Sequence, residues 1–285
     1  MKLIECPRDA LQGLKEFVPT ELKLEYMNQL LKVGFDTLDF GSFVSPKWIP
    51  QLADTHQIVK KLDLSSTYTK LLAIVANLRG AKDACVYDEV SYLGFPFSIS
   101  ETFQIKNINA TLKESIGRVD DIQRVNDLCN KFNKEMVIYI SMAFGNPYGD
   151  PWDHDIIFEW VDKLAEMGIK YIALSDTVGV STPQSINSVF TNIVYEYPEI
   201  EFGAHFHTTP DTWQEKIKAS YDAGCRRFDG AIKGYGGCPM AASKLVGNMP
   251  MENMIQEFSG MGIDLGLNME AFAESMKIAG RVFPH

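Results

Sequence analysis

The sequence predicts a (β/α)8 TIM barrel with extra C-terminal helices, formed as a single domain over residues 1–285. Three observations support this fold class. Eight short apolar runs recur along the chain, amphipathic stretches separate them, and no low-complexity linker or shift in composition divides the sequence. A doubly wound open sheet is the alternative. Its nucleotide-binding version is disfavoured because no GxGxxG or GxxxxGK[ST] follows an early strand.

The predicted strands are short, apolar and rich in β-branched or aromatic residues, as strands buried on both faces are. They are KLIEC (2–6), FDTLDF (35–40), LLAIVA (71–76), EVSYLGF (89–95), MVIYISM (136–142), YIALSDT (171–177), EFGAHFH (201–207) and RFDGAI (227–232). Eight strands alternating with helices over about 250 residues are typical of this barrel.

The predicted helices show apolar residues at helical spacing and end at glycine or proline signals. In residues 20–34, Leu24, Met27 and Leu31 share one face. Further helices are expected over 153–168 and 182–198, and one or two closing helices over 251–262 and 268–280. The KNIN segment (106–109) is expected to be a loop that leads into a long helix.

Composition excludes several classes of protein. The net charge of −10 disfavours nucleic acid as a partner. No apolar run reaches the length of about 18 residues that a membrane span needs, and the start MKLIECPRDA has no signal-peptide pattern. The five cysteines are scattered without a CxxC pair, which favours a reduced, cytoplasmic protein.

Two histidines in the seventh predicted strand are the first candidates for a site. His205 and His207 are two residues apart, so they point to the same face of a strand. Two imidazoles on one face could bind a metal ion, but they could equally be core histidines bonded to their neighbours. This stretch alone does not decide between the two interpretations.

Polar residues follow or end most of the other predicted strands. In a TIM barrel these ends meet at the rim that carries the active site. The residues are Arg8, Asp9, Asp39, Ser141, Asp176, Thr177, His205, His207 and Asn248. Asp9, His205, His207 and Asn248 would give two oxygens and two nitrogens, which suit Mg²⁺ or Mn²⁺ better than zinc. Taken singly, Asp9 could instead pair with Arg8, and Asn248 could be a turn residue.

A glycine-rich loop, GYGGCP (234–239), follows the eighth predicted strand and carries Cys238. Glycines allow backbone conformations in which a loop can close over a substrate. A thiol delivered by such a loop could act as a general acid or base if its pKa is suitable. The alternative is an inert cysteine in a tight turn.

Several segments together resemble the 3-hydroxy-3-methylglutaryl-CoA lyase family. They are FGSFVSPKWIPQLAD (40–54), KNIN (106–109), SDTVGVSTP (175–183), HFH (205–207) and GYGGCP (234–239). PRDALQ (7–12) is similar to the first-strand signature of the wider metallolyase superfamily with TIM-barrel fold. The resemblance runs from about Glu5 to the GLNMEAF segment (266–272), nearly the whole chain.

The resemblance implies cleavage of 3-hydroxy-3-methylglutaryl-CoA to acetyl-CoA and acetoacetate by a retro-Claisen reaction. It implies a divalent metal ion, Mg²⁺ or Mn²⁺, an acyl-CoA substrate and a homodimer. It assigns metal ligands to Asp9, His205, His207 and Asn248, and catalytic roles to Arg8, Asp39, Asp176, His205 and Cys238. Substrate contacts are expected from Arg8, Ser141, Thr177 and Asn268.

Three departures from the family pattern keep other functions open. Asp39 stands where the lyases usually have Glu, Thr208-Thr209-Pro210-Asp211 replaces Asp-Thr-Tyr-Gly, and CPRDA replaces GPRDG. One alternative is a related Claisen synthase or aldolase, and another is a lyase for a different hydroxyacyl-CoA. A catalytically silent barrel that binds an acyl-CoA is the third.

Overall fold

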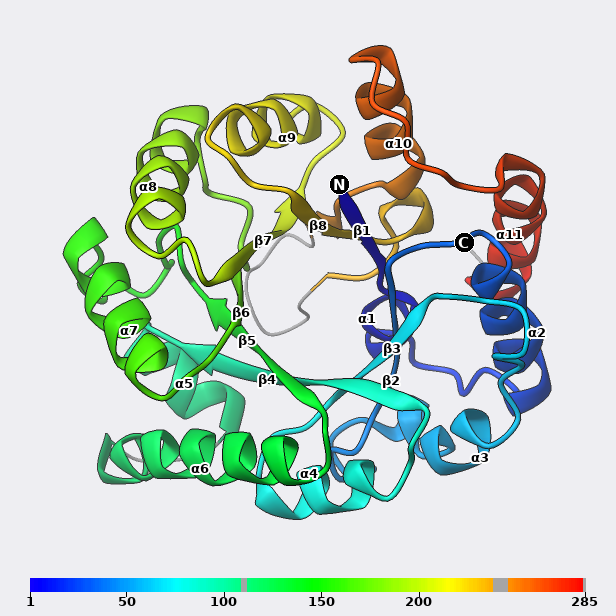
Figure 1. The fold of residues 1–285 in the computed structure, drawn as a ribbon, viewed down its shortest axis with the longest axis horizontal. Helices are drawn as coiled ribbons and strands as arrows, with labels where there is room; N and C mark the ends of the chain where they lie inside the picture. The colour runs from blue at the N-terminus through cyan, green and yellow to red at the C-terminus, as the bar shows by residue number, and fades with distance from the viewer. Residues whose placement is uncertain (109–111, 238–245, 284–285) are drawn as a thin grey trace.

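The computed structural model describes residues 1–108, 112–237 and 246–283. Eight parallel strands form a barrel, and helices surround it on the outside (Figure 1). The strands are β1 (Lys2–Glu5), β2 (Thr37–Ser42), β3 (Lys70–Ile74), β4 (Val90–Ser98), β5 (Glu135–Ser141), β6 (Tyr171–Asp176), β7 (Glu201–Thr208) and β8 (Arg227–Gly230).

Backbone pairing closes the sheet into a ring. Strand β1 pairs with β2 on one side and with β8 on the other, while β6 pairs with β7, so no strand of the eight is left as an edge. Because all these pairings are parallel, the carboxyl ends of the eight strands meet at one rim. A short ninth strand, β9 (Gly247–Asn248), pairs antiparallel with the end of β7 at that rim.

Some of the helices begin at residues whose side chains accept from their free N–H groups. Asp153 caps α7, and Thr182 forms a capping box with Ser185 at the start of α8. The helices longer than seven residues are α2 (Thr20–Leu31), α4 (Leu78–Cys85), α5 (Glu101–Ile108), α6 (Leu112–Lys131), α7 (His154–Glu166), α8 (Pro183–Glu196), α9 (Trp213–Asp222), α10 (Met251–Gly260) and α11 (Met269–Val282). None of the helices in the described ranges has the length and apolar character that a bilayer crossing requires.

The predicted barrel is confirmed, and its closure rules out the open sheet. All eight predicted strands are present, as are the two closing helices, α10 and α11. The prediction of a loop at KNIN is wrong for residues 106–108, because α5 continues through Ile108. No pattern in the sequence predicts β9, which is only two residues long.

Alternation along each strand divides the buried side chains into two groups. The lumen of the barrel holds a layer of Leu72, Ile74, Tyr92, Val137, Tyr139 and Ala173. The larger apolar core lies between the strands and the surrounding helices. Polar side chains above the lumen layer therefore face the rim, where the site lies.

Glu5 at the end of β1 is fully buried between the strands and the outer elements. Its Oε1 accepts a hydrogen bond from the Ile232 N–H at 3.0 Å, while its Oε2 has no partner among the described residues. Burial raises the pKa of Glu5 well above its ordinary value of 4.5. The folded protein therefore holds this proton more tightly than the unfolded chain does.

We expect Glu5→Gln to stabilise the protein at high pH. Folding raises the pKa of this acid, so the folded state loses stability as the pH rises from the pKa of the unfolded chain towards the pKa of the folded protein. Glutamine removes that cost and can still accept the hydrogen bond from the Ile232 N–H. At pH 8 the free energy of unfolding of the variant should be about 1–3 kcal/mol higher than that of the wild type, and at pH 4 the two should differ little. Urea unfolding at both pH values measures this, with exposed Glu196→Gln as the control. A difference that does not change with pH would contradict it.

Candidate active site

A pocket of about 430 Å³ opens at the carboxyl-terminal rim of the barrel. Its walls come from the ends of several strands and the segments that follow them. The lining residues are Arg8, Asp9, Gln12, Val44, Ser45, Trp48, Ile49, Ile74, Ala76, Asn77, Pro96, Phe103, Tyr139, Ser141, Ser175, Thr177, His205 and His207. Six of the predicted site residues therefore share one cavity.

Arg8 lies in the first turn of the short helix α1 (Pro7–Gln12), directly after β1. Its Nε and Nη2 donate to the Asp39 carboxylate at 2.6–3.2 Å, and its Nη1 donates to Asp9 and Gln12 at 2.9 and 3.0 Å. A guanidinium has five N–H groups, so one on Nη2 remains for the pocket. The carboxylates outweigh the effect of burial and raise the pKa of Arg8, which keeps it charged.

Asp39 completes this ion pair although it is shorter than the glutamate of the family pattern. It is 1% exposed, and its Oδ2 lies 2.6 Å from Nη2 of Arg8. Burial raises the pKa of Asp39 to about 6 in spite of the arginine. Asp39 is therefore mostly ionised at pH 7. It pairs with Arg8 although the family usually has the longer Glu at this position.

Asp9 and the two histidines form a group with the chemistry of a metal site. One ligand-type atom from each of Asp9, His205 and His207 lies within 4.8 Å of the others. Asn248 donates to the Asp9 Oδ2 at 2.7 Å, because β9 places it opposite His207. The charges of Arg8 and the histidines outweigh burial and lower the pKa of Asp9 to about 2. The four predicted ligands are therefore neighbours.

The two histidines differ in their surroundings. Burial and the neighbouring His205 lower the pKa of His207 to about 4, and its Nδ1 has no hydrogen-bond partner among the described residues. Burial opposes protonation of His205 as well, but the hydrogen bond from its Nδ1 to Asp229 (3.1 Å) raises its pKa above 6.5. An unpartnered, buried, neutral imidazole beside a carboxylate is what a metal ligand requires.

Ser141 and Thr177, which are expected to contact the substrate, line the pocket. Thr177 accepts a hydrogen bond from the Met142 N–H at 2.9 Å, which ties the end of β6 to the residue after β5. Met142 has a positive φ of 61°, a strained conformation that such a bond helps to hold. The Thr177 hydroxyl proton remains available to the pocket.

Asp176 is not brought into the pocket. In the β6–β7 register, Ser175 lies opposite His205, whereas Asp176 lies opposite Phe206. Asp176 therefore points away from the lumen, where its Oδ2 lies 2.6 Å from Nζ of the fully buried Lys216 on α9. Lys216 also donates to the carbonyl oxygens of His207 and Gly179 at 3.3 and 3.1 Å. Asp176 therefore lies behind the histidine strand and does not line the pocket.

Asn268 and Cys238 are not part of the described pocket, for different reasons. Asn268 is exposed and caps α11, where it accepts from the Ala271 N–H, and its own N–H bonds to Val33 near the amino-terminal end of the barrel. That is the end opposite the site, so the predicted substrate contact does not fit the structure. Cys238 lies outside the described residues.

Sequence reasoning missed several residues of the site. Gln12 bonds to Arg8, and Trp48 lines the pocket while 74% exposed. Tyr139 packs edge-on against His205, with ring centroids 5.5 Å apart, and Asp229 bonds to the same histidine. The signal for Asp229 was a carboxylate in the interior of a predicted strand. The signal for Tyr139 was its spacing of two from Ser141 on the same strand face.

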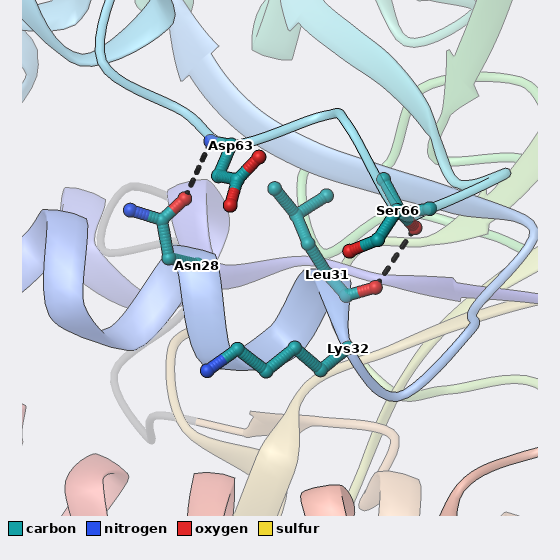
Figure 2. Close-up of a pocket in the computed structure, with 6 residues that line it drawn as sticks. Asn28, Leu31, Lys32, Asp63 and Ser66 are labelled. Atoms are coloured by element: carbon teal, nitrogen blue, oxygen red, sulfur yellow. Dashed lines mark hydrogen bonds between the residues drawn. The ribbon is translucent and has the colours of Figure 1, made fainter.

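A second, smaller pocket of about 140 Å³ lies between α2 and the segment before β3 (Figure 2). Asn28 accepts from the Asp63 N–H across it, and Thr67 donates to the Leu31 carbonyl. Its position at the amino-terminal side of β3 separates it from the rim that carries the histidines. It has no group of metal-ligand side chains.

A family model described as HMGL-like matches residues 3–278. The cytoplasmic 3-hydroxy-3-methylglutaryl-CoA lyase of Rattus norvegicus is 32% identical over 278 residues, which cover 96% of this chain and 79% of that protein. The hydroxymethylglutaryl-CoA lyase of Bacillus subtilis is 31% identical, with 95% and 89% covered.

Solved structures of such lyases are also similar. The HMG-CoA lyase of Bacillus subtilis superposes with a TM-score of 0.90 at 30% identity, covering 98% of this chain and 92% of that one. The HMG-CoA lyase of Acinetobacter baumannii, in complex with coenzyme A and 3-methylmalate, also has a TM-score of 0.90, at 27% identity, with 100% and 92% covered.

We expect Lys216→Met to lower the free energy of unfolding by about 3–5 kcal/mol, because it leaves the buried Asp176 carboxylate without its cation. Adding Asp176→Asn should recover part of that loss. Denaturant unfolding measures both variants. Lys218→Met is the matched control on the same helix, since its partner Asp222 is exposed, and it should change stability by less than about 1 kcal/mol. An equally small effect at Lys216 would show that the buried pair does not hold this strand.

Proposed function

Because the chain belongs to the HMGL-like family and is a carbon–carbon lyase, we propose that it cleaves 3-hydroxy-3-methylglutaryl-CoA to acetyl-CoA and acetoacetate. The observation that carries the proposal is one cavity in which Arg8, Asp9, His205 and His207 meet at the rim of the barrel. The lyases that resemble this chain at about 31% identity, and the neighbour that binds coenzyme A with a hydroxy diacid, support this substrate.

We propose that the site holds a divalent cation, Mg²⁺ or Mn²⁺, through Asp9, His205, His207 and Asn248. The unpartnered Nδ1 of His207 and the ionised Asp9 fit such an ion. Asn248 would have to give up the hydrogen bond that its Nδ2 donates to Asp9 and turn its oxygen inward. A bound cation would supply Lewis-acid polarisation of the substrate hydroxyl.

The remaining steps use side chains of the chain itself. The tertiary hydroxyl of the substrate loses its proton, the bond between C2 and C3 breaks, and acetoacetate leaves with the new carbonyl. The electron pair moves onto the thioester and forms an enolate. The enolate oxygen would accept a hydrogen bond from the free N–H of Arg8. A proton delivered to C2 then completes acetyl-CoA. Asp39 holds Arg8 in place for this contact.

The proton acceptor is either His205 or Asp9. Nδ1 of His205 already donates to the Asp229 carboxylate, so only Nε2 can take a proton or bind a metal ion, and it cannot do both at once. Asp9, with a pKa of about 2, is ionised at every working pH but is a weak base.

Cys238 is proposed as the acid that protonates C2. The described part of its loop ends beside the site: Gly236 has a φ of 93°, and a side chain there would meet the Asp9 carbonyl oxygen at 2.9 Å.

The proposal is tested by the release of acetoacetate from 3-hydroxy-3-methylglutaryl-CoA with Mn²⁺, and again after chelation. We expect cleavage that needs the metal and that His205→Ala removes, while the exposed His56→Ala control retains it. A folded, metal-binding protein without cleavage would overturn the proposed substrate. Assays with other hydroxyacyl-CoA thioesters and of the condensation direction would then test the alternatives.

We expect Cys238→Ala to lower turnover by about 10²–10⁴-fold, the usual contribution of a general acid. Affinity for Mn²⁺ should stay within about twofold, since the cysteine is not among the proposed ligands. Turnover assays and calorimetric Mn²⁺ titration measure the two quantities. Unchanged turnover would remove Cys238 from the mechanism.

The affinity for Mn²⁺ should rise with pH. A histidine must be neutral to bind metal. Because the pKa of His205 is raised above its ordinary value of 6.5, protons compete with the ion at a pH below this raised pKa. His207 and Asp9, with pKa values of about 4 and 2, are already deprotonated above pH 6. Calorimetry between pH 6 and 9 should therefore show the release of some protons, but of no more than one per ion. Release of two protons, or none across this range, would contradict the assignment.

A further inference from the structure

Below His205, the lumen of the barrel contains two buried charged groups that the proposed reaction does not use. Arg227 and Asp229 lie on β8 and are 1% and 2% exposed. The lumens of TIM barrels are usually filled by branched apolar side chains. Charged residues in this position cost free energy unless they are paired, so the pair needs a physical explanation.

The β7–β8 register places both groups beside β7, the strand that carries the histidines. His205 lies opposite Asp229, and Gly203 lies opposite Arg227. A side chain at position 203 would come within 3.0 Å of the Arg227 Cδ, so the glycine leaves the space that the arginine occupies. Tyr92 lies beneath the guanidinium, with its ring centroid 5.8 Å from Cζ.

Polar contacts link these residues from His205 down to the opposite end of the barrel. The His205 Nδ1 bonds to Asp229 Oδ2 at 3.1 Å, and Asp229 Oδ1 lies 3.9 Å from Arg227 Nε. Arg227 Nη1 in turn reaches Glu201 at 3.5 Å. A carboxylate can only accept a hydrogen bond, so His205 must carry its proton on Nδ1 while Asp229 is ionised.

We infer that Asp229, held in place by the charge of Arg227, is a positioning residue that fixes His205 in the Nδ1–H tautomer and turns its Nε2 towards the pocket. Carboxylates that orient a histidine in this way usually change metal affinity by 10- to 100-fold when they are removed. The inference rests on the proposed metal-binding role of His205, but on no particular substrate.

A competing role for Asp229 is direct metal binding. Asp229, His205 and Cys6 also bring ligand-type atoms within 4.8 Å of one another. In that arrangement Asp229 would give up its bond to His205, and Cys6 would contribute its thiolate. The two roles differ in what Cys6→Ala does, since Cys6 has no part in orienting the imidazole.

The first test is nitrogen NMR of the ¹⁵N-histidine-labelled full chain without metal, with the His205 signals assigned by His205→Gln. We expect Nδ1–H in the wild type and a mixed or Nε2–H tautomer in Asp229→Asn, because an asparagine can donate as well as accept. If His205 keeps the Nδ1–H tautomer in Asp229→Asn, the inference is overturned. This readout requires no turnover, so its outcome is independent of the proposed reaction.

The second test is calorimetric titration with Mn²⁺ at pH 8. Asp229→Asn should weaken binding by about 10- to 100-fold. Cys6→Ala and the exposed Asp222→Asn control should stay within about twofold. Equal, near-complete losses in Asp229→Asn and Cys6→Ala would instead assign both residues as ligands and overturn the inference.

A third variant guards against misfolding, since Asp229→Asn removes the buried carboxylate beside Arg227 and leaves it only the contact with Glu201. The double variant Arg227→Met/Asp229→Asn removes both charges together, and it should fold while showing the same tautomer change and the same loss of Mn²⁺ affinity. A folded double variant with wild-type tautomer and affinity would overturn the inference. If the wild-type protein gives the expected results in both tests but does not cleave 3-hydroxy-3-methylglutaryl-CoA, only the proposed substrate is contradicted.

Discussion

Hydrogen bonding between β1 and β8 and between β6 and β7 closes the barrel, and the site depends on that closure. In a closed parallel sheet each strand has one face towards the lumen and one towards the helices. Side chains at alternate positions near the carboxyl ends therefore converge on a single cavity, although they can be 199 residues apart in the sequence. Arg8 and His207 meet in this way.

The same alternation explains why the groups that support the site lie in two separate places. From the lumen, Asp229 holds the imidazole of His205. From the helix side, Lys216 bonds to the backbone of His207 and to Asp176. Each of these charges is nearly fully buried, and a buried ion pair contributes little net stability. Their common effect is to fix the orientation of one strand end, which a metal-binding pair of histidines requires.

Much of this could be predicted from the sequence because strand ends are local signals. The eight strands and the group of Arg8, Asp9, His205 and His207 follow from apolar runs and from the polar residues that end them. Asp176 could not be placed by that rule, since a strand-end position does not say which face a residue takes. Its face depends on the register with Phe206. Asn268 was assigned by resemblance alone, and its place at the far end of the barrel depends on how α11 packs.

Charge around the histidines gives an independent reason for a cation at this site. Three carboxylates, of Asp9, Asp39 and Asp229, surround two guanidinium groups, of Arg8 and Arg227. With neutral histidines the cluster therefore has one net negative charge. An acyl-CoA that ends in a carboxylate is itself an anion, so the cavity without a cation would repel it. One divalent ion would reverse the sign of the cluster, so the proposed cation and the proposed substrate would each favour the binding of the other before any bond is broken.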